Sequence, residues 1–414
     1  MKIFGGRRPV NGSADFLMTV SMAAVLLLLA RPATSQDRPS DRVVAGRTIA
    51  QWRELIGQID FADRQSAAYV AGLVAVMEDR EVPWFTRRQA ALTLGRLGPL
   101  ARDAVPRVLR LIDETGDDPE TAAALWSIKA IALYGPIAAE TTPTLIDRLR
   151  DPRTDWFARL SLLEAISQIG PSHPAALAVL IDAARDPAAV YPRLTEEQAL
   201  EFRRLACESL GAIGPAAAAA TPVLARLLES DDAHVRRAAA DGLARFGPLA
   251  TEAGPALADR VLLDEELEVR DAALIALARL GPEMLPRVQP WLMSDSPLLQ
   301  QDALRLYREW GPAVRRSLPD VAPFLQHEDR LTRLAARAAA AKMTGEVAPH
   351  LQPVIECLGD DDRGVRQEAA RLLIEWGRTS TAVVPTVERM QNDSRPRVRA
   401  AVHHILERIA AQKP

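Results

Sequence analysis

Apolar residues recur along the chain with the period of a helix, and glycine interrupts them at regular intervals. Four residues before each of these glycines stands a residue without charge, whereas positions two and six before it are charged in many copies. An apolar stripe and a polar stripe on one segment are typical of an amphipathic helix. The uncharged positions are Leu94, Ile131, Ile166, Leu210, Leu243, Leu277, Tyr307, Ala341 and Leu373.

Glycine and proline mark the two ends of a unit of about 35 residues, a length typical of helical-pair repeats. A helix commonly stops at a residue in the left-handed conformation, which favours glycine. Proline suits the first helical turn, where its missing N–H is not needed. The unit is therefore a helix opened by proline, an acidic turn, a second helix and a glycine, often followed by proline. The glycines are Gly98, Gly135, Gly170, Gly214, Gly247, Gly281, Gly311, Gly345 and Gly377. The prolines are Pro106, Pro143, Pro174, Pro222, Pro255, Pro286, Pro319, Pro349 and Pro385.

Arginine stands eleven residues before the glycine in most copies, close to an aspartate at the turn. We expect each aspartate, such as Asp232 and Asp362, to cap the second helix. We also expect it to accept hydrogen bonds from arginines of adjacent layers, which would form a structural ladder along the stack. The arginines of this ladder are Arg87, Arg159, Arg203, Arg236, Arg270, Arg366 and Arg399. Gln300 and Ala124 interrupt the series, and Arg333 lies one residue out of phase.

These features resemble the HEAT repeat and the shorter HEAT-like units of the phycobilisome-lyase type. Both have an Asp in the turn and Val-Arg at the start of the second helix, as in residues 232–240, 269–273, 362–366 and 398–402. The resemblance implies an all-α protein with the right-handed α–α superhelix of armadillo and HEAT solenoids. About ten helix pairs would form a HEAT-like repeat array over residues 63–414.

The residues before the array predict a separate helix. Gly46-Arg47-Thr48 together with Trp52 resembles the opening of many exported bacterial HEAT arrays. Thr48 and Gln51 have the spacing of a capping box. We expect an N-terminal capping helix over residues 48–62 that covers the exposed end of the stack, preceded by a short linker over residues 36–47.

Residues 1–35 have the pattern of a secretory signal peptide. Lys2, Arg7 and Arg8 precede an apolar run over residues 16–30, and the small residues Ala33 and Ser35 suit cleavage after Ser35. The run is shorter than the roughly 20 residues needed to span a membrane. We therefore expect a periplasmic or secreted protein without a membrane span after cleavage. Anchoring to the inner membrane by an uncleaved segment is the alternative.

Charge and candidate ligands point away from several functions. A formal net charge of -3 and the lack of a basic groove oppose nucleic-acid binding, including that of HEAT-type DNA glycosylases.

We expect the two cysteines, Cys207 and Cys357, to be free, apolar-like residues. Residues 360–362 lack the glutamate that a calcium loop needs at its twelfth position. His403, His404 and Glu407 are interpreted as solvated polar residues. We expect no metal and no cofactor.

The repeat itself predicts binding rather than catalysis. The sequence has neither a nucleophile elbow nor a glycine-rich phosphate loop. A stack of helix pairs presents a long surface and no compact pocket. We therefore expect an exported scaffold, without catalysis of its own, that binds a protein or peptide along its curved surface. The alternative is a lyase-like HEAT-repeat enzyme or an accessory subunit of an enzyme.

Two surfaces are candidates for binding a partner. The pair between Pro174 and Gly214 is longer than the others, and the insert over residues 186–196 carries Tyr191 and Arg193. Tyrosine and arginine are frequent anchors of interfaces, and insertions in solenoids often collect on the binding face. A longer loop without a role is the alternative for this insert. The competing surface is a ridge formed by Arg96, Arg245 and Arg279, in which Asp241 would neutralise Arg245 one turn away.

The signal peptide gives the first prediction. We expect the mature protein to begin near Gln36 and to occur outside the cytoplasm, because residues 16–30 are too short to span the bilayer. Fractionation of bacteria expressing the whole chain, followed by mass spectrometry of the N-terminal peptide, measures this. Intact residues 1–35 on protein from the cytoplasmic fraction would contradict it.

Overall fold

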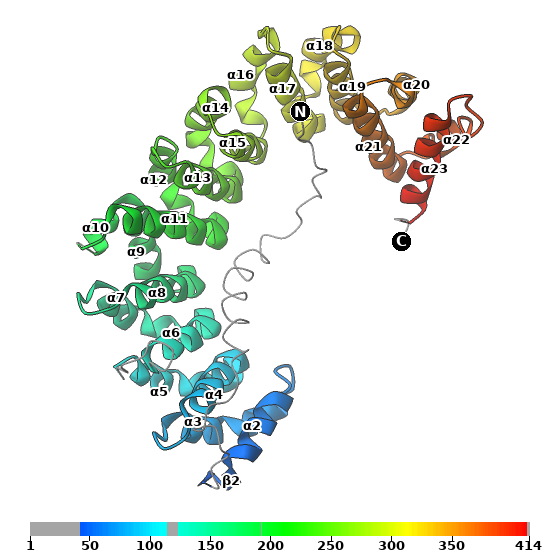
Figure 1. The fold of residues 1–414 in the computed structure, drawn as a ribbon. Helices are drawn as coiled ribbons and strands as arrows, with labels where there is room; N and C mark the ends of the chain where they lie inside the picture. The colour runs from blue at the N-terminus through cyan, green and yellow to red at the C-terminus, as the bar shows by residue number, and fades with distance from the viewer. Residues whose placement is uncertain (1–41, 114–122, 192, 412–414) are drawn as a thin grey trace. The chain divides into compact units, whose positions relative to one another are not determined.

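The structure is a computed structural model of the 414-residue chain, and it describes residues 42–113, 123–191 and 193–411. The expected signal peptide over residues 1–35 and the start of the expected linker lie outside the described residues. Among the described residues, all regular elements are helical apart from one two-stranded hairpin (Figure 1). The prediction of an all-α solenoid is confirmed.

The described part of the expected linker is folded. Strands β1 (Val43–Val44) and β2 (Arg47–Thr48) pair antiparallel around a turn in which Gly46 has a φ of 79°. The hairpin is held by the next helix, because the indole Nε1 of Trp52 donates to the carbonyl of Val44 at 2.8 Å. Residues 43–47, the end of the expected linker, are therefore folded, and the prediction for this stretch was wrong. A buried indole needs such an acceptor, which the hairpin provides.

The N-terminal helix α2 (Ile49–Gln58) begins at the predicted capping box. The Thr48 hydroxyl accepts from the Gln51 N–H, and the Gln51 side chain accepts from the Thr48 N–H. The helix ends at Gln58, four residues before the expected position 62, and Ile59 is its C-cap residue. Trp52 packs directly on α3 (Val70–Glu78), since a Cβ atom at Gly72 would lie 2.2 Å from the indole.

The chain divides into two compact units, residues 1–217 and 218–414. The further helices of the first unit are η2 (Arg64–Tyr69), α4 (Trp84–Leu97), η3 (Gly98–Ala104), α5 (Val105–Arg110), η4 (Leu111–Asp113), α6 (Ala123–Tyr134), η5 (Gly135–Thr141), α7 (Thr142–Arg150), α8 (Trp156–Ile169), η6 (Gly170–Ser172), α9 (Pro174–Arg185), α10 (Pro187–Val190) and α11 (Glu196–Ile213). The 3-10 helix η7 (Gly214–Ala220) lies at the division.

The helices of the second unit are α12 (Thr221–Leu227), α13 (Ala233–Phe246), η8 (Gly247–Ala253), α14 (Gly254–Leu263), α15 (Leu267–Leu280), η9 (Pro282–Met284), α16 (Leu285–Val288), η10 (Gln289–Met293), α17 (Pro297–Trp310), η11 (Gly311–Ser317), α18 (Leu318–Val321), η12 (Ala322–Gln326), α19 (Arg330–Thr344), α20 (Ala348–Glu356), η13 (Cys357–Gly359), α21 (Arg363–Thr379), α22 (Val383–Glu388) and α23 (Pro396–Ala410). In both units the helices form pairs, and the second helices of the pairs are α4, α6, α8, α11, α13, α15, α17, α19, α21 and α23.

Burial follows the predicted stripe. All nine uncharged positions four residues before a glycine are buried, from Leu94 to Leu373. Within each unit these stripes bring second helices together, as in the contacts of α4 with α6 and of α13 with α15. Each pair therefore buries its apolar side against its neighbours, as a repeat array requires.

Glycine ends the second helices as predicted, with one exception. Eight of the nine glycines have a positive φ, between 51° and 109°. Gly377 instead lies inside α21, so the prediction that it ends a helix was wrong. A Cβ atom there would lie 2.3 Å from Cδ1 of Ile409, so this glycine permits the close packing of α23.

The aspartates of the turn cap the second helices as expected. Asp232 accepts from the N–H of Val235 at 2.9 Å, and Asp362 accepts from the N–H of Val365 at 3.1 Å. Each bond satisfies an N–H of the first helical turn, which has no partner inside the helix. The capping role of these two residues is therefore present in the structure.

The arginines have different partners from those of the expected ladder. Arg87 Nε donates to the carbonyl of Met77 at 2.7 Å, and Arg203 Nε donates to that of Ala184 at 3.2 Å. Arg366 and Arg399 likewise donate to backbone carbonyls at the end of their own turn. The last carbonyls of a helix lack intrahelical partners and carry partial negative charge, so they attract a guanidinium group. These arginines therefore join the two helices of one pair, and Arg87 also lies over the ring of Trp126 in the next pair, 5.3 Å from its centre.

Two apparent exceptions in the arginine series, Gln300 and Arg333, make the same kind of hydrogen bond as the members of the series. Gln300 donates to the carbonyl of Ser294 at 2.7 Å, and Arg333 donates to the carbonyl of Glu328 at 2.9 Å. Both stand four residues after the residue that caps their helix, as Arg236 and Arg366 do. The hydrogen-bonding residue therefore keeps a constant spacing from the capping residue at the start of the helix, and not from the glycine at its end. Arg333 looked displaced because α19 is one residue longer than α13 before its glycine.

One arginine also makes the contact between layers that we expected of all. Arg236 donates through Nε and Nη2 to both carboxylate oxygens of Asp264, at 2.8 and 2.9 Å, and Nη1 donates to the carbonyl of Ser230. Asp264 is buried and lies directly after α14, in the next pair. Arg270 occupies the same position of α15, but within the described residues no hydrogen bond or ion pair of its side chain is found.

This difference gives the second prediction. We expect Arg236→Ala to lower the free energy of unfolding by about 2 to 4 kcal/mol, because it leaves the buried Asp264 carboxylate without its main partner. Arg270→Ala is the matched control and should cost less than about 1 kcal/mol. Urea unfolding followed by circular dichroism measures both. An equal loss in the two variants would show that the Asp264 contact is not what stabilises the stack.

Candidate functional site

The insert over residues 186–196 is more ordered than the loop we expected. Residues 187–190 form the short helix α10, which is capped by the Asp186 carboxylate and packs on α9. Val190 is buried. Tyr191 lies on Arg159, whose guanidinium carbon is 3.2 Å from the centre of the ring. Tyr191 therefore covers an arginine of the scaffold and is half-buried, whereas Arg193 is exposed.

Arg159 explains why an aromatic ring is needed there. Its side chain is buried and donates to the carbonyls of Leu149 and Asp151 at the end of α7. Burial lowers the pKa of this guanidinium, and the nearby Tyr191 and Asp151 oppose the shift. A ring stacked over a desolvated cation gives it a favourable electrostatic contact without adding a charge.

The three ridge arginines occupy equivalent positions of different helices. Arg96, Arg245 and Arg279 each stand thirteen residues after the residue that caps their helix, and all three are exposed. Arg245 and Arg279 lie in the second unit on the consecutive second helices α13 and α15. Arg96 lies in the first unit and stacks over Phe61, with 5.8 Å to the ring centre. The ridge is therefore a property of the repeat.

In four second helices of the second unit, unlike in α19, where Leu334 and Ala338 are buried, equivalent positions spaced four apart lie on one exposed or half-buried face. Counted from the capping residue they are the fifth, ninth and thirteenth. In the second unit they include Arg237, Asp241 and Arg245 of α13, Asp271, Ile275 and Arg279 of α15, Gln301, Arg305 and Glu309 of α17, and Gln367, Arg371 and Glu375 of α21. We call this set the inner ridge of the second unit.

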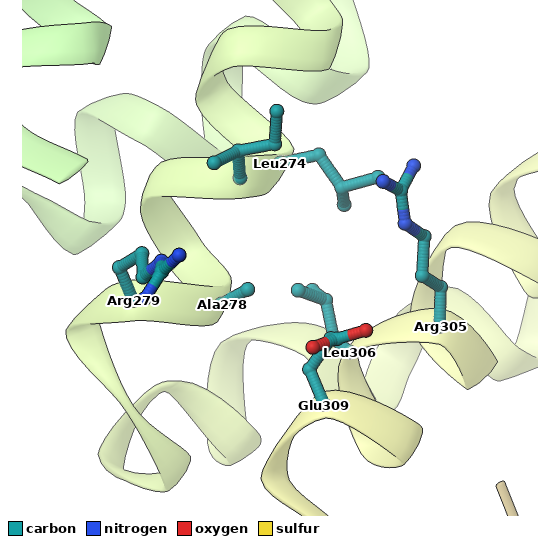
Figure 2. Close-up of a pocket in the computed structure, with 7 residues that line it drawn as sticks. Leu274, Ala278, Arg279, Arg305, Leu306 and Glu309 are labelled. Carbon is teal, nitrogen blue, oxygen red and sulfur yellow. The ribbon is translucent and has the colours of Figure 1, made fainter. Parts of the chain in front are cut away.

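The inner ridge is hollowed between α15 and α17 (Figure 2). The hollow has a volume of about 380 Å³ and is lined by Leu274, Ile275, Ala278, Arg279, Arg305, Leu306 and Glu309. Leu274 and Leu306 are buried and form an apolar floor, whereas Ile275 is 44% exposed. In Figure 2 the two arginines lie on opposite sides of the hollow, with Glu309 at one end. We call these seven residues the α15–α17 hollow.

The charges on either side of the hollow differ in how they are paired. Arg237 forms ion pairs with Asp241 at 3.8 Å and with Glu268, and Arg371 forms ion pairs with Glu368 and Glu375. Arg308 also reaches Glu375. Arg279 and Arg305, in contrast, form no hydrogen bond or ion pair with any residue that the structure describes. Their guanidinium groups are therefore available to a ligand.

A carboxyl group beside the hollow has an unusual proton affinity. The pKa of Asp302 is raised to about 6, chiefly by burial, which disfavours the charged form because it removes water from the carboxylate. Arg305 lowers this pKa, Asp271 raises it and Arg270 lowers it. Asp302 is therefore mostly ionised at pH 7, and its carboxylate lies near enough to Arg305 for the two charges to interact.

Sequence reasoning identified Arg279 but missed Ile275, Arg305 and Glu309. Ile275 stands six residues before Gly281, a position that is charged in neighbouring copies as Asp241 and Arg305. An apolar residue in a charged column was the signal in the sequence. It could not show that α15 and α17 leave space between them.

The described residues contain no group of three or more His, Cys, Asp or Glu side chains that could hold a metal ion. His403 pairs with Glu407 at 3.4 Å on α23, and both are exposed. Cys207 and Cys357 are free. Residues 196–227 are long and apolar enough to cross a membrane, with a mean hydropathy of 1.3, but they comprise three helices interrupted at Gly214, where φ is 72°.

Comparison with known proteins identifies the repeat. A family model for HEAT repeats matches residues 187–278. The match identifies HEAT repeats in this part of the chain. Comparison with curated protein sequences gives no match.

Solved structures of Kap95 and Kap121p share the fold. They include a chain of the Kap95:Nup1 complex (13% identity, TM-score 0.54), yeast importin-β, Kap95p (15%, 0.53), and Kap121p (13%, 0.53). The matches cover 88%, 88% and 96% of this chain but 56%, 53% and 46% of those chains. The chain thus spans about half the length of these structures. At such low identity the likeness shows the fold alone.

The raised pKa of Asp302 gives the third prediction. An acid whose pKa is higher in the folded than in the unfolded chain costs no stability below its unfolded pKa, and costs most above its folded pKa. Asp302→Asn should therefore raise the free energy of unfolding by about 1 to 3 kcal/mol at about pH 7.5 and change it little at about pH 4.

Thermal unfolding at several pH values measures this effect. Asp259→Asn, at an exposed position of α14, is the control and should show no such pH dependence. A stabilisation by Asp302→Asn that is the same at low and at neutral pH would contradict the assignment.

Proposed function

We propose that this protein is an exported HEAT-repeat scaffold, without catalysis of its own, that binds a protein or peptide partner on the inner ridge of its second unit. The observation that supports this most directly is the α15–α17 hollow. There two arginines without a hydrogen bond or ion pair among the described residues flank an exposed isoleucine, while Arg237 of α13 and Arg371 of α21 pair with acids within the protein.

The kind of side chains in the hollow favours binding over chemistry. Its seven residues are two arginines, one glutamate and four apolar residues. General acid–base or nucleophilic catalysis requires a nucleophile or base held close to a second group that activates it. Arginines beside an apolar floor are typical instead of interfaces.

The fold is consistent with a protein partner. Each pair in a HEAT array contacts only its neighbours, which leaves the exposed faces of the second helices as one extended surface within a unit. The matched Kap95 structure is itself a complex with another protein, Nup1. For this chain, a protein partner is part of our proposal.

Export is proposed from residues 1–35, which have the charge pattern, the apolar run and the small residues of a signal peptide. Periplasmic or secreted localisation follows from cleavage near Ser35. The runner-up function is that of a lyase-like HEAT enzyme or accessory subunit. It predicts a bound chromophore or metal in the purified protein.

The fourth prediction tests the surface. A photo-crosslinking amino acid placed at Arg245 or at Arg279 should link the protein to a partner in cell-envelope extracts, because both positions are exposed on the inner ridge. The matched control is Arg287, an exposed residue of the first helix α16, which should give no such product. Mass spectrometry identifies what is linked.

Three outcomes would count against the proposal. Crosslinks of equal yield from Arg287 would place the partner elsewhere or show random encounter. The absence of any crosslink at the ridge would remove this surface from the function. A stoichiometric chromophore or metal in the purified protein would favour the lyase-like alternative.

A further inference from the structure

We propose that the α15–α17 hollow binds an acidic peptide segment by inserting one of its aliphatic side chains between Arg279 and Arg305. This inference rests on the proposed function and adds the chemistry of the partner. The three features that carry it are the exposed isoleucine, the apolar floor and the two arginines whose charge is not paired within the described residues.

The apolar part of the hollow requires an apolar ligand group. Ile275 is 44% exposed, although it has the equivalent place in its helix to Asp241 in α13 and Arg305 in α17. Beneath it lie the buried side chains of Leu274 and Leu306. Covering Ile275 with an aliphatic side chain removes its surface from water, which is favourable in proportion to the area covered.

The size of the hollow suits a short segment. Its volume of about 380 Å³ is near the lower end of the range for ligand sites, which begins at about 300 Å³. An aliphatic side chain with its own backbone and parts of the two flanking residues fills such a space. The lining residues span Leu274 to Arg279 of α15 and Arg305 to Glu309 of α17, little more than one turn of each helix, which also suits a short segment.

The two arginines indicate that the bound peptide segment is negatively charged. Arg279 extends from α15 and Arg305 from α17, on opposite sides of the hollow (Figure 2). A guanidinium group binds a carboxylate through two parallel hydrogen bonds, so each arginine can hold one acidic side chain. Carboxylates on both sides of the aliphatic residue match this arrangement.

The acidic groups near the hollow do not reverse this preference. Glu309 faces Arg371 of α21, and the negative charge of Glu309 contributes to raising the pKa of Arg371. Asp302, whose pKa burial raises to about 6, is mostly ionised at pH 7 and interacts with Arg305, but it does not line the hollow. The lining itself carries two arginines and one glutamate, a net positive charge, whereas Arg237 and Arg371 are already paired with acids.

The fifth prediction uses the mature chain and fluorescent Gly/Ser peptides with a central isoleucine between glutamates. Fluorescence anisotropy should show saturable binding of this peptide. It should be lost when the glutamates are replaced by lysines, and weakened about fivefold or more when the isoleucine is replaced by serine. Arg279→Gln and Arg305→Gln should each weaken binding about tenfold, as expected for the loss of hydrogen bonds to a charged group.

Two further variants show whether the hollow itself is responsible. Ile275→Ser should weaken binding of the isoleucine peptide but not change that of the serine peptide. Arg287→Gln, on the first helix α16, is the matched control and should bind as the unaltered protein does. Circular dichroism of each variant confirms that the helices are intact.

The inference and the proposed function can fail separately. If a partner crosslinks at Arg279 but the acidic peptide does not bind, the chemistry proposed here is overturned and the scaffold function remains. If the isoleucine and serine peptides bind equally, the aliphatic contact is overturned. If Arg287→Gln weakens binding as much as Arg305→Gln, the attraction is one of general charge, and the hollow is not the site.

Discussion

Each helix pair buries its apolar stripe only by packing against the pairs beside it, and the other features of the structure depend on this constraint. It requires one uncharged position, from Leu94 to Leu373, on the buried side of every second helix. It also leaves the opposite side of those helices without a role in the core. That side can therefore vary from pair to pair, and in the second unit it carries charges, a hollow and an exposed isoleucine.

Arginine has two separate uses in this protein. Near the start of the second helices it satisfies carbonyls at the end of the preceding helix, as Arg87 does for Met77. This is a structural use, because those carbonyls lack intrahelical partners. On the inner ridge arginine is exposed. There it is available to a ligand only where no acidic side chain of the protein already pairs with it. Arg237 has such acids, whereas Arg279 has none among the described residues.

The insert in the first unit illustrates how a surface feature can belong to the scaffold. Tyr191 and Arg159 are far apart in the sequence, and neither suggests the other. In the structure the ring lies on the guanidinium group of a buried arginine, which itself holds the end of α7. The same argument applies to Trp52, whose indole needs the carbonyl of Val44 and so orders the hairpin before the first helix.

The sequence by itself determined the features that depend on short-range geometry. The capping aspartates, the capping box of Thr48, eight glycines with a positive φ and the apolar stripe all follow from residues within about one or two helical turns. Only the tertiary structure decided which arginines are paired. Arg236 and Arg270 have equivalent positions, yet only Arg236 faces a buried aspartate of the next pair. The hollow between α15 and α17 could not be predicted from the sequence either. The space between two helices is set by the packing of residues that lie far apart along the chain.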